Sequence, residues 1–381
     1  MKASDKIKIA YFNGTMVEGQ DGVTRTLFRI VDYLEQHNIE SKFYSPLFSK
    51  STEDKINIKR VNSFKLPFYK DYNIPIPQKR TLSMDLDKFA PDIIHIHSPC
   101  PLGKFAVNYA KKRDIPVFAT YHTHFPSYIK YYNLQVIKYF GWNYLKNLYN
   151  ACDVVFVPSQ SIITELSEHN FKNLIHLPNG IETNLFSKDF YNKNWKKNNG
   201  IENKQVLLFV GRLVWEKGLQ VLIDADKILR SLRNDYVFVF VGDGPAQFEL
   251  QNQIPNSIFL GRLYGEKLSE VYASSDLFVF PSATETFGIV LLEAMASKLP
   301  IICVNKNGPS DLIQNQVNGI LVPPDKPVDF ANNINDLLLR PDFMEQISEN
   351  AYRTVQNYSW DNIISKMFEY YESYYYSKIN I

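Results

Sequence analysis

LFVFPSATETFGIVLLEAMASKLP runs from Leu277 to Pro300 and decides the fold class. Its first four residues are continuously apolar, as expected for a parallel strand that is covered on both faces. From Phe287 to Ala296 every residue except Glu293 is apolar or glycine, which indicates a helix buried on every side. A buried strand followed by a buried helix predicts an α/β domain with a doubly wound sheet.

The same alternation of short β-branched or aromatic runs with helical patterns extends along the whole chain. It predicts two doubly wound, Rossmann-like domains in tandem, over residues 1–190 and 200–359. We expect ligands beyond the carboxyl ends of the strands, in the cleft where the two domains face each other. Lys188–Lys204 has no periodicity and is predicted to be the linker. The predicted strands are 6–13, 41–45, 92–97, 116–121, 153–158, 174–177, 206–210, 236–241, 257–260, 277–281, 300–304 and 319–322.

The bulk composition narrows the classes of function. The chain has 381 residues, 45% of them hydrophobic, and a formal net charge of +2, which gives no electrostatic reason to expect nucleic acid as a partner. Three cysteines without a CxxC pair indicate buried free thiols in a reducing cytoplasm. The N-terminus has no signal-peptide core, and no run of about 18 apolar residues predicts a membrane span. We therefore expect a cytoplasmic protein.

The glycine-rich loops do not fit a dinucleotide-binding enzyme. The glycines of NGTMVEGQDGVTRT lack the GxGxxG spacing, and FVGDGPAQF has Gln247 in place of the third glycine. A nicotinamide cofactor is therefore not expected. Gly22, before VTRTLFRIV, could set bare backbone against an anion at a helix N-terminus, and an ordinary strand-to-helix turn explains the same loop equally well.

Arg212 and Lys217 follow a predicted strand in GRLVWEKG. A guanidinium that binds bidentately and an ammonium point charge together suit a diphosphate. The alternative is a solvated loop in which Glu216 balances the charge of Lys217.

His122 lies at the end of another predicted strand, in YHTHFP. It is interpreted as a hydrogen-bond donor in the cleft, with a buried and satisfied histidine as the alternative. His124 stands two residues on, but no third ligand lies at zinc spacing, so no metal site is expected. Asp85 and Asp87 form a DxD, for which we prefer Ser83 or Asp85 as a helix N-cap over a metal–nucleotide ligand.

Two glutamates flank the turn after the strand at Leu277. Glu285 and Phe287–Gly288 stand where a helix start favours anionic ligands. Glu293 lies too deep in the helix to cap it, and burying an unpaired carboxylate costs several kcal/mol. A ligand diol such as ribose would satisfy it. The alternative is a core glutamate satisfied by a lysine or a backbone N–H group.

ETFGIVLLEAMA, from Glu285 to Ala296, resembles the E-x7-E motif of retaining nucleotide-sugar glycosyltransferases of family four, which have the GT-B fold. Four further segments resemble family positions and follow the family's order. They are PNGI at 178–181, GR and EKG within 211–218, VGDGP at 241–245 and LG at 260–261. The resemblance covers nearly the whole chain and is weaker between about Phe43 and Asp87.

The resemblance implies a role for each matched residue. Arg212 and Lys217 would hold the donor diphosphate and stabilise it as it leaves. Glu293 would accept from the ribose hydroxyls, and Glu285 would hold sugar hydroxyls. His122 would lie over the donor sugar near the reacting carbon. The remaining positions assigned to substrate binding are Gly22, Gly211, Gly242, Phe287, Gly288, Ile289 and Val290.

The resemblance also implies the chemistry. A hexose moves from a nucleoside diphosphate to an acceptor hydroxyl, and its anomeric configuration is retained. No cofactor and no metal are expected, because Arg and Lys take the place of a divalent cation at the leaving phosphate. UDP-glucose is the default donor and GDP-mannose its rival. The C-terminal helix, over residues 360–381, would pack back on the first domain.

The acceptor is expected to be a membrane lipid. Asp21–Arg25 and Tyr121–Tyr128 look closer to the diacylglycerol-type branch than to enzymes with soluble acceptors. Residues 125–149 interleave lysines with aromatic residues, as interfacial helices do, and 65–80 adds more of both, so we expect peripheral contact with the inner face of the cell membrane. An aromatic core helix with solvated lysines explains the pattern as well. A polysaccharide or other soluble acceptor, and a non-catalytic sugar-nucleotide-binding module, are the other hypotheses.

Overall fold

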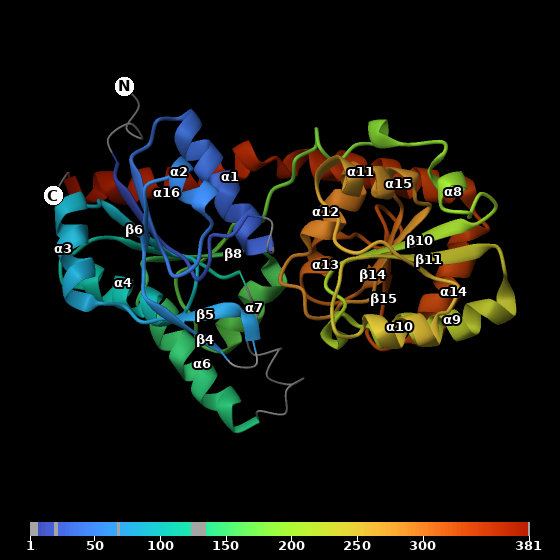
Figure 1. Cartoon of the computed structure of the whole chain (residues 1–381), viewed down its shortest axis with the longest axis horizontal. Helices are drawn as coiled ribbons and strands as arrows, with labels where there is room; N and C mark the ends of the chain where they lie inside the picture. The colour runs from blue at the N-terminus through green and yellow to red at the C-terminus, as the bar shows by residue number, and fades with distance from the viewer. Residues whose placement is uncertain (1–6, 19–21, 67–68, 123–134, 380–381) are drawn as a thin grey trace. The chain divides into compact units, whose positions relative to one another are not determined.

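The computed structural model describes residues 7–18, 22–66, 69–122 and 135–379. The chain forms two compact units. Unit 1 consists of Met1–Asn179 together with Trp360–Ile381, and unit 2 of Gly180–Ser359 (Figure 1).

Unit 1 is built on a parallel sheet of seven strands in the order β3-β2-β1-β6-β7-β8-β9. Helices α1 and α16 pack on one face, and α3, α4, α6 and α7 on the other. The elements are β1 (Ile9–Phe12), α1 (Gly22–Gln36), β2 (Ser41–Ser45), α2 (Lys50–Lys55), β3 (Ile58–Arg60), β4 (Ser63–Leu66), β5 (Tyr69–Pro75), α3 (Lys79–Phe89), β6 (Ile93–Ile96), α4 (Pro101–Lys111), β7 (Val117–Thr120), α6 (Gln135–Tyr149), β8 (Val154–Val157), α7 (Gln160–Glu168), β9 (Leu174–His176) and α16 (Trp360–Ile379).

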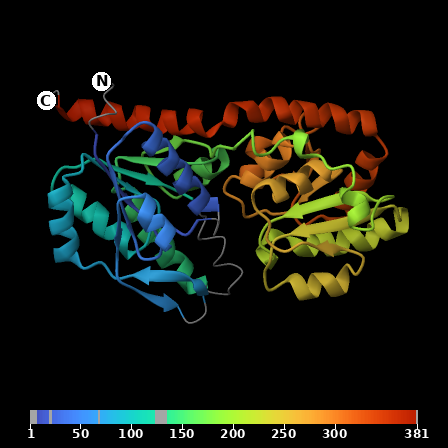
Figure 2. The ribbon, with the colours of Figure 1, turned by 45° about the horizontal axis from the view of Figure 1, so that its top comes forward.

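Unit 2 is built on a parallel sheet of six strands in the order β12-β11-β10-β13-β14-β15. Helices α9, α10 and α14 cover one face and α11, α12 and α15 the other (Figures 1 and 2). The elements are η2 (Lys188–Phe190), α8 (Trp195–Asn198), β10 (Gln205–Val210), η3 (Trp215–Lys217), α9 (Leu219–Leu232), β11 (Tyr236–Val241), α10 (Gln247–Gln253), β12 (Ile258–Phe259), α11 (Gly265–Ser274), β13 (Leu277–Phe280), α12 (Ile289–Ala296), β14 (Ile301–Val304), α13 (Gly308–Leu312), β15 (Ile320–Val322), α14 (Pro327–Leu338), α15 (Pro341–Val355) and η4 (Gln356–Tyr358).

The predicted doubly wound α/β class is confirmed, and each predicted run contains a strand. β13, for example, is buried at every position, as a central parallel strand should be. Edge strand β3 and the antiparallel pair β4–β5 were not predicted. The cysteines are buried and free, as expected.

The sequence predicted that Lys188–Lys204 is a linker between the domains, and this prediction is wrong. The segment lies inside unit 2, whose boundary falls at Gly180. Trp195 of α8 is buried in the core of unit 2, and Lys188 Nζ donates to the carbonyl of Ala273 at 2.7 Å. Because the segment is mostly polar, its composition gave no indication of these two contacts.

Helix α16 belongs to unit 1. It buries one apolar face against α1 and the central strands, and its aromatic residues make edge-on ring contacts there. The buried residues of α16 in this core are Trp360, Ile364, Met367, Phe368 and Tyr371.

The DxD residues are not helix caps, because α3 begins at Lys79 and both aspartates lie in its second half. Asp85 pairs with Lys42 at 2.8 Å, and Asp87 pairs with Arg113 at 2.8 Å. Both carboxylates therefore hold α3 against its neighbours.

The described side chains of α6 belong largely to the core. Leu145, Leu148 and Tyr149 are buried, and Trp142 stacks on the ring of His169 with centroids 3.9 Å apart. This part of 125–149 therefore follows the core-helix alternative, while 123–134 and residues 67–68 of the second expected contact lie outside the described residues. Among the helices that the structure describes, none has the length and apolar run needed to cross a bilayer.

Candidate active site

The strand order of unit 2 places its candidate site at a topological switch point. The chain runs from β10 outward to β11 and β12, then returns to β13 on the other side of β10. Doubly wound sheets bind ligands at such a point, beyond the carboxyl ends of the two central strands. Arg212 and Lys217 follow β10, and Glu285 and Gly288 follow β13.

Gly211 and Gly242 let two of these loops cross with their backbones in contact. Gly242 has φ +131, and a Cβ built on it would lie 1.9 Å from the carbonyl oxygen of Gly211. No side chain fits there. The N–H of Gly211 donates to Val241 at 3.0 Å, and that of Gly242 to Gly261 at 2.7 Å. These bonds fix the backbone from which Arg212 projects.

Lys217 is positioned by the tight turn that follows it. Gly218 has φ +73, and a Cβ there would lie 2.4 Å from the carbonyl oxygen of Pro281, so only glycine lets the turn press against the end of β13. This brings Lys217 Nζ into an ion pair with Glu285 Oε1. The two side chains are only 11% and 20% exposed, so solvent screens the pair weakly.

Arg212 has a carboxylate partner of its own. Its Nη2 lies 3.8 Å from Oε1 of Glu216, whose side chain is 5% exposed, while the arginine is 45% exposed. The alternative in which Glu216 balances Lys217 is therefore wrong, since Lys217 pairs with Glu285. Glu216 was not among the predicted site residues, although its buried carboxylate lies within ion-pair distance of the guanidinium.

The turn from Phe287 to Val290 offers backbone N–H groups. Gly288 adopts φ +95 as the N-cap of α12, and the amides of Ile289 and Val290 belong to the first helical turn, which has no intrahelical acceptors. The next loop supports this turn from behind: the Gly308 N–H donates to Glu285 O at 3.2 Å. A Cβ on Gly308 would lie 2.3 Å from Cα of Phe287. The helix start can therefore face an anion.

Glu293 lies fully buried in α12. Its Oε2 accepts a hydrogen bond from the hydroxyl of Tyr272 at 2.7 Å. The expected alternative, a core glutamate satisfied by lysine or backbone, did not include a tyrosine partner 21 residues away. The hydroxyl fixes one carboxylate oxygen and so orients the other.

The two predicted positions of unit 1 follow its own sheet. Gly22 begins α1, and its carbonyl accepts from Thr26 Oγ1 at 3.0 Å. His122 follows β7, and its Nε2 lies 2.8 Å from Nδ1 of His97, which follows β6. His97 was not predicted as a site residue, although HIH at the end of a buried strand places a histidine where ligands bind.

Three histidines of unit 1, His95, His97 and His122, form a row of ring contacts, in which His95 and His97 are buried. The rings of His95 and His97 stack with centroids 4.1 Å apart, and His95 contacts the hydroxyl of Tyr371. Burial lowers the pKa of all three rings, that of His122 to about 4. Because neutral imidazoles have one donor and one acceptor nitrogen, the His97–His122 bond links their tautomers.

The lowered pKa values of these histidines predict that the folded state loses stability at acid pH. Unfolded histidine takes up a proton near pH 6.5 while these rings stay neutral in the folded state, so the unfolded state binds more protons. The free energy of unfolding should fall as pH drops from 6.5 towards 5. Chemical denaturation of His122→Asn should show a shallower slope, by up to about 1.4 kcal/mol per pH unit. His37→Asn, an exposed control, should keep the original slope. Equal slopes for the two variants would contradict the prediction.

The comparisons with known proteins match both units. The model "Glycosyltransferase Family 4" matches residues 20–185, and "Glycosyl transferases group 1" matches residues 192–354. A GDP-mannose-dependent alpha-mannosyltransferase of Corynebacterium glutamicum is 30% identical over 378 residues, covering 96% of this chain and 88% of the relative. This chain belongs to glycosyltransferase family 4.

Two further comparisons extend this result. Alpha-monoglucosyldiacylglycerol synthase of Acholeplasma laidlawii is 26% identical, with 93% of this chain and 94% of the relative covered. Anabaena HepE, solved in complex with UDP, superposes with a TM-score of 0.79 at 20% identity, covering 96% of this chain and 100% of HepE. That likeness confirms the GT-B fold, with its two Rossmann-like units.

Proposed function

We propose that this family 4 glycosyltransferase moves a hexose from a nucleoside-diphosphate sugar to an acceptor hydroxyl with retention of configuration and without a metal. The observation that carries the proposal is the placement of two carboxylate-anchored cations, Arg212 and Lys217, at the switch point of unit 2. In the same unit, the first turn of α12 follows the other central strand. Cations and free amides together suit a pyrophosphate.

The reaction proceeds by front-face attack. The bond between the anomeric carbon and the phosphate oxygen breaks, and the acceptor oxygen bonds to the same carbon. The acceptor proton passes to the leaving phosphate oxygen. Arg212 and Lys217 stabilise the charge that develops on the diphosphate, so that no divalent metal is needed for this role.

Glu285, Glu293 and His122 orient the sugar nucleotide. Glu285 has a second carboxylate oxygen with which to accept from sugar hydroxyls while Oε1 stays with Lys217. Glu293, oriented by Tyr272, accepts from the ribose diol. His122, kept neutral by burial, exchanges a hydrogen bond with the donor sugar rather than a proton.

The donor is UDP-glucose in the first instance, and GDP-mannose is the second candidate. The Corynebacterium relative, a GDP-mannose-dependent mannosyltransferase, favours the second. The Acholeplasma relative is an alpha-monoglucosyldiacylglycerol synthase by name, which supports a lipid acceptor. With such an acceptor the enzyme would work at the inner face of the cell membrane. A glycan acceptor remains the competing proposal.

A donor screen tests the proposal. Thermal unfolding with UDP-glucose, GDP-mannose and the free nucleotides should show a raised midpoint for one donor, because a ligand that binds the folded state stabilises it. That donor should be hydrolysed slowly without acceptor, which a non-catalytic binding module would not do. Product NMR should show a retained anomer, and an inverted product would refute the mechanism. Salt-sensitive binding to anionic liposomes would favour the lipid acceptor.

Glu293→Gln should weaken binding of the stabilising nucleotide by about 1–3 kcal/mol, because the ribose diol loses a charged acceptor. Isothermal titration calorimetry measures this. Tyr272→Phe is the matched control: it removes the structural hydrogen bond and keeps the carboxylate, so it should cost stability and much less affinity. Unchanged affinity in Glu293→Gln together with a less stable fold would mean that Glu293 serves the core alone.

A further inference from the structure

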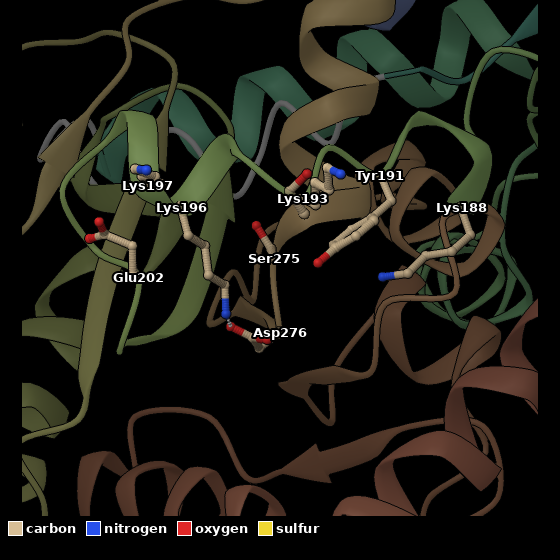
Figure 3. A pocket seen from close by; sticks show the side chains of 9 residues that line it. Lys188, Tyr191, Lys193, Lys196, Lys197, Glu202, Ser275 and Asp276 are labelled. Carbon is tan, nitrogen blue, oxygen red and sulfur yellow. Dashed lines mark hydrogen bonds and ion pairs between the residues drawn. The ribbon is translucent and has the colours of Figure 1, made fainter.

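A lysine-rich pocket lies in unit 2, apart from the proposed donor site. It has a volume of about 330 Å³ and is lined chiefly by the segment Lys188–Lys204, which had been predicted to be a linker (Figure 3). Lys188, Lys193, Lys196 and Lys197 contribute four ammonium groups, against two carboxylates in the lining. We call this group the lysine pocket.

The lysine pocket lies at the amino ends of the central strands of unit 2, and the proposed donor site lies at their carboxyl ends. Asp276, in the pocket, immediately precedes β13, whereas Glu285 follows that strand. The segment that supplies the lysines leads into the amino end of β10, whereas Arg212 follows its carboxyl end. β10 has six residues, which at about 3.3 Å per residue separates its ends by roughly 17 Å. The pocket is therefore a separate site.

Two of the four ammonium groups hold the pocket together. Lys196 Nζ donates to Asp276 Oδ2 at 2.6 Å and to the carbonyl of Lys204 at 3.1 Å. The same aspartate oxygen accepts from the N–H of Val206 at 2.7 Å. Lys188 Nζ donates to the carbonyl of Ala273 at 2.7 Å. Asp276 is thus satisfied by its own neighbours, and its negative charge is compensated within the wall of the pocket.

The other two ammonium groups are available to a ligand. Lys193 and Lys197 are exposed, and within the described part of the chain no carboxylate pairs with either. Tyr191, 56% exposed, projects its hydroxyl into the hollow beside Ser275 (Figure 3). Exposed ammonium groups and a tyrosine hydroxyl in the lining of one pocket suit an anion with several oxygens, since lysine binds phosphate as a point charge.

We propose that the lysine pocket binds a phosphate group, carried either by an anionic membrane lipid or by a soluble phosphorylated compound. Lys193 and Lys197 neutralise the phosphate oxygens, and the Tyr191 hydroxyl donates to one of them. This phosphate site is separate from the site proposed for the donor diphosphate. A failure of one proposal therefore leaves the other unaffected.

The test uses the double variant Lys193→Gln/Lys197→Gln, because these two exposed side chains make no hydrogen bond or ion pair with the described residues. Lys267→Gln/Lys326→Gln is the matched control, because it removes the same charge from exposed positions of unit 2 outside the pocket. Equal thermal midpoints establish that both variants fold. Each is titrated with inorganic phosphate at constant ionic strength, and separately with vesicles containing roughly 30% phosphatidylglycerol in phosphatidylcholine.

We expect the pocket variant to bind at least one probe about tenfold more weakly than the wild type and the control. Loss of phosphate binding alone identifies a soluble ligand, and loss of vesicle binding identifies the lipid. Phosphate that binds at the donor site is common to all three proteins and cancels from the comparison. The proposal is overturned if the pocket variant matches the wild type with both probes, or if the control weakens as much.

Discussion

Arg212→Ala should lower the rate of sugar transfer by at least about 100-fold, as loss of a charge partner of the transition state does elsewhere. The guanidinium projects from a backbone crossing that Gly211 and Gly242 fix, and Glu216 lies 3.8 Å from it. The positive charge of Arg212 is therefore already in position before the diphosphate leaves. Steady-state transfer with the donor found in the screen measures the loss, which should appear mainly in kcat.

Two controls separate this charge from a general loss of positive charge. Arg262→Ala removes an exposed arginine, paired with Asp243 at 2.6 Å, from the loop after β12 and should leave kcat near the wild-type value. Arg212→Lys keeps a charge but cannot bind bidentately, so it should restore only part of the rate. If Arg212→Ala turns over like the wild type, Arg212 does not act on the leaving group.

The fold was predictable because its central strands carry their own signal. Strands such as β11 and β13 are continuous apolar runs, since a parallel sheet is covered on both faces. β3, with only three residues at the edge, and the β4–β5 pair outside both sheets lack that signal. The error over Lys188–Lys204 has the same origin: one buried tryptophan anchors a segment whose composition is otherwise polar.

The candidate site was predictable in position and less so in its pairings. Strand-end loops could be found from the sequence, so Arg212, Lys217 and Glu285 were singled out. That Lys217 pairs with Glu285, 68 residues away, follows from the packing of Gly218 against Pro281. Contacts at such separations leave no periodicity to detect, and the same holds for the bond between His97 and His122.

The second large effect concerns the Lys217–Glu285 pair. Lys217→Met should abolish most transfer activity, because the diphosphate loses a charge partner, and should also destabilise unit 2. Removing one member of a buried pair leaves an uncompensated charge; with side chains 11% and 20% exposed we expect a loss of about 2–4 kcal/mol. Glu285→Gln should lower the free energy of unfolding by a similar amount, because it leaves the ammonium group of Lys217 without its counter-charge. Chemical denaturation and transfer assays on the same samples measure both quantities.

The double variant Lys217→Met/Glu285→Gln separates structure from chemistry. With both charges gone, no uncompensated charge remains, so the free energy of unfolding should return most of the way towards the wild-type value. Activity should not return, because the cation that meets the diphosphate is still missing. A double variant that recovers stability and activity together would make the pair a structural feature alone. Recovery of stability without activity would mean that the pair acts in the reaction as well as in the fold, with Lys217 at the leaving phosphate and Glu285 held beside it at the donor sugar.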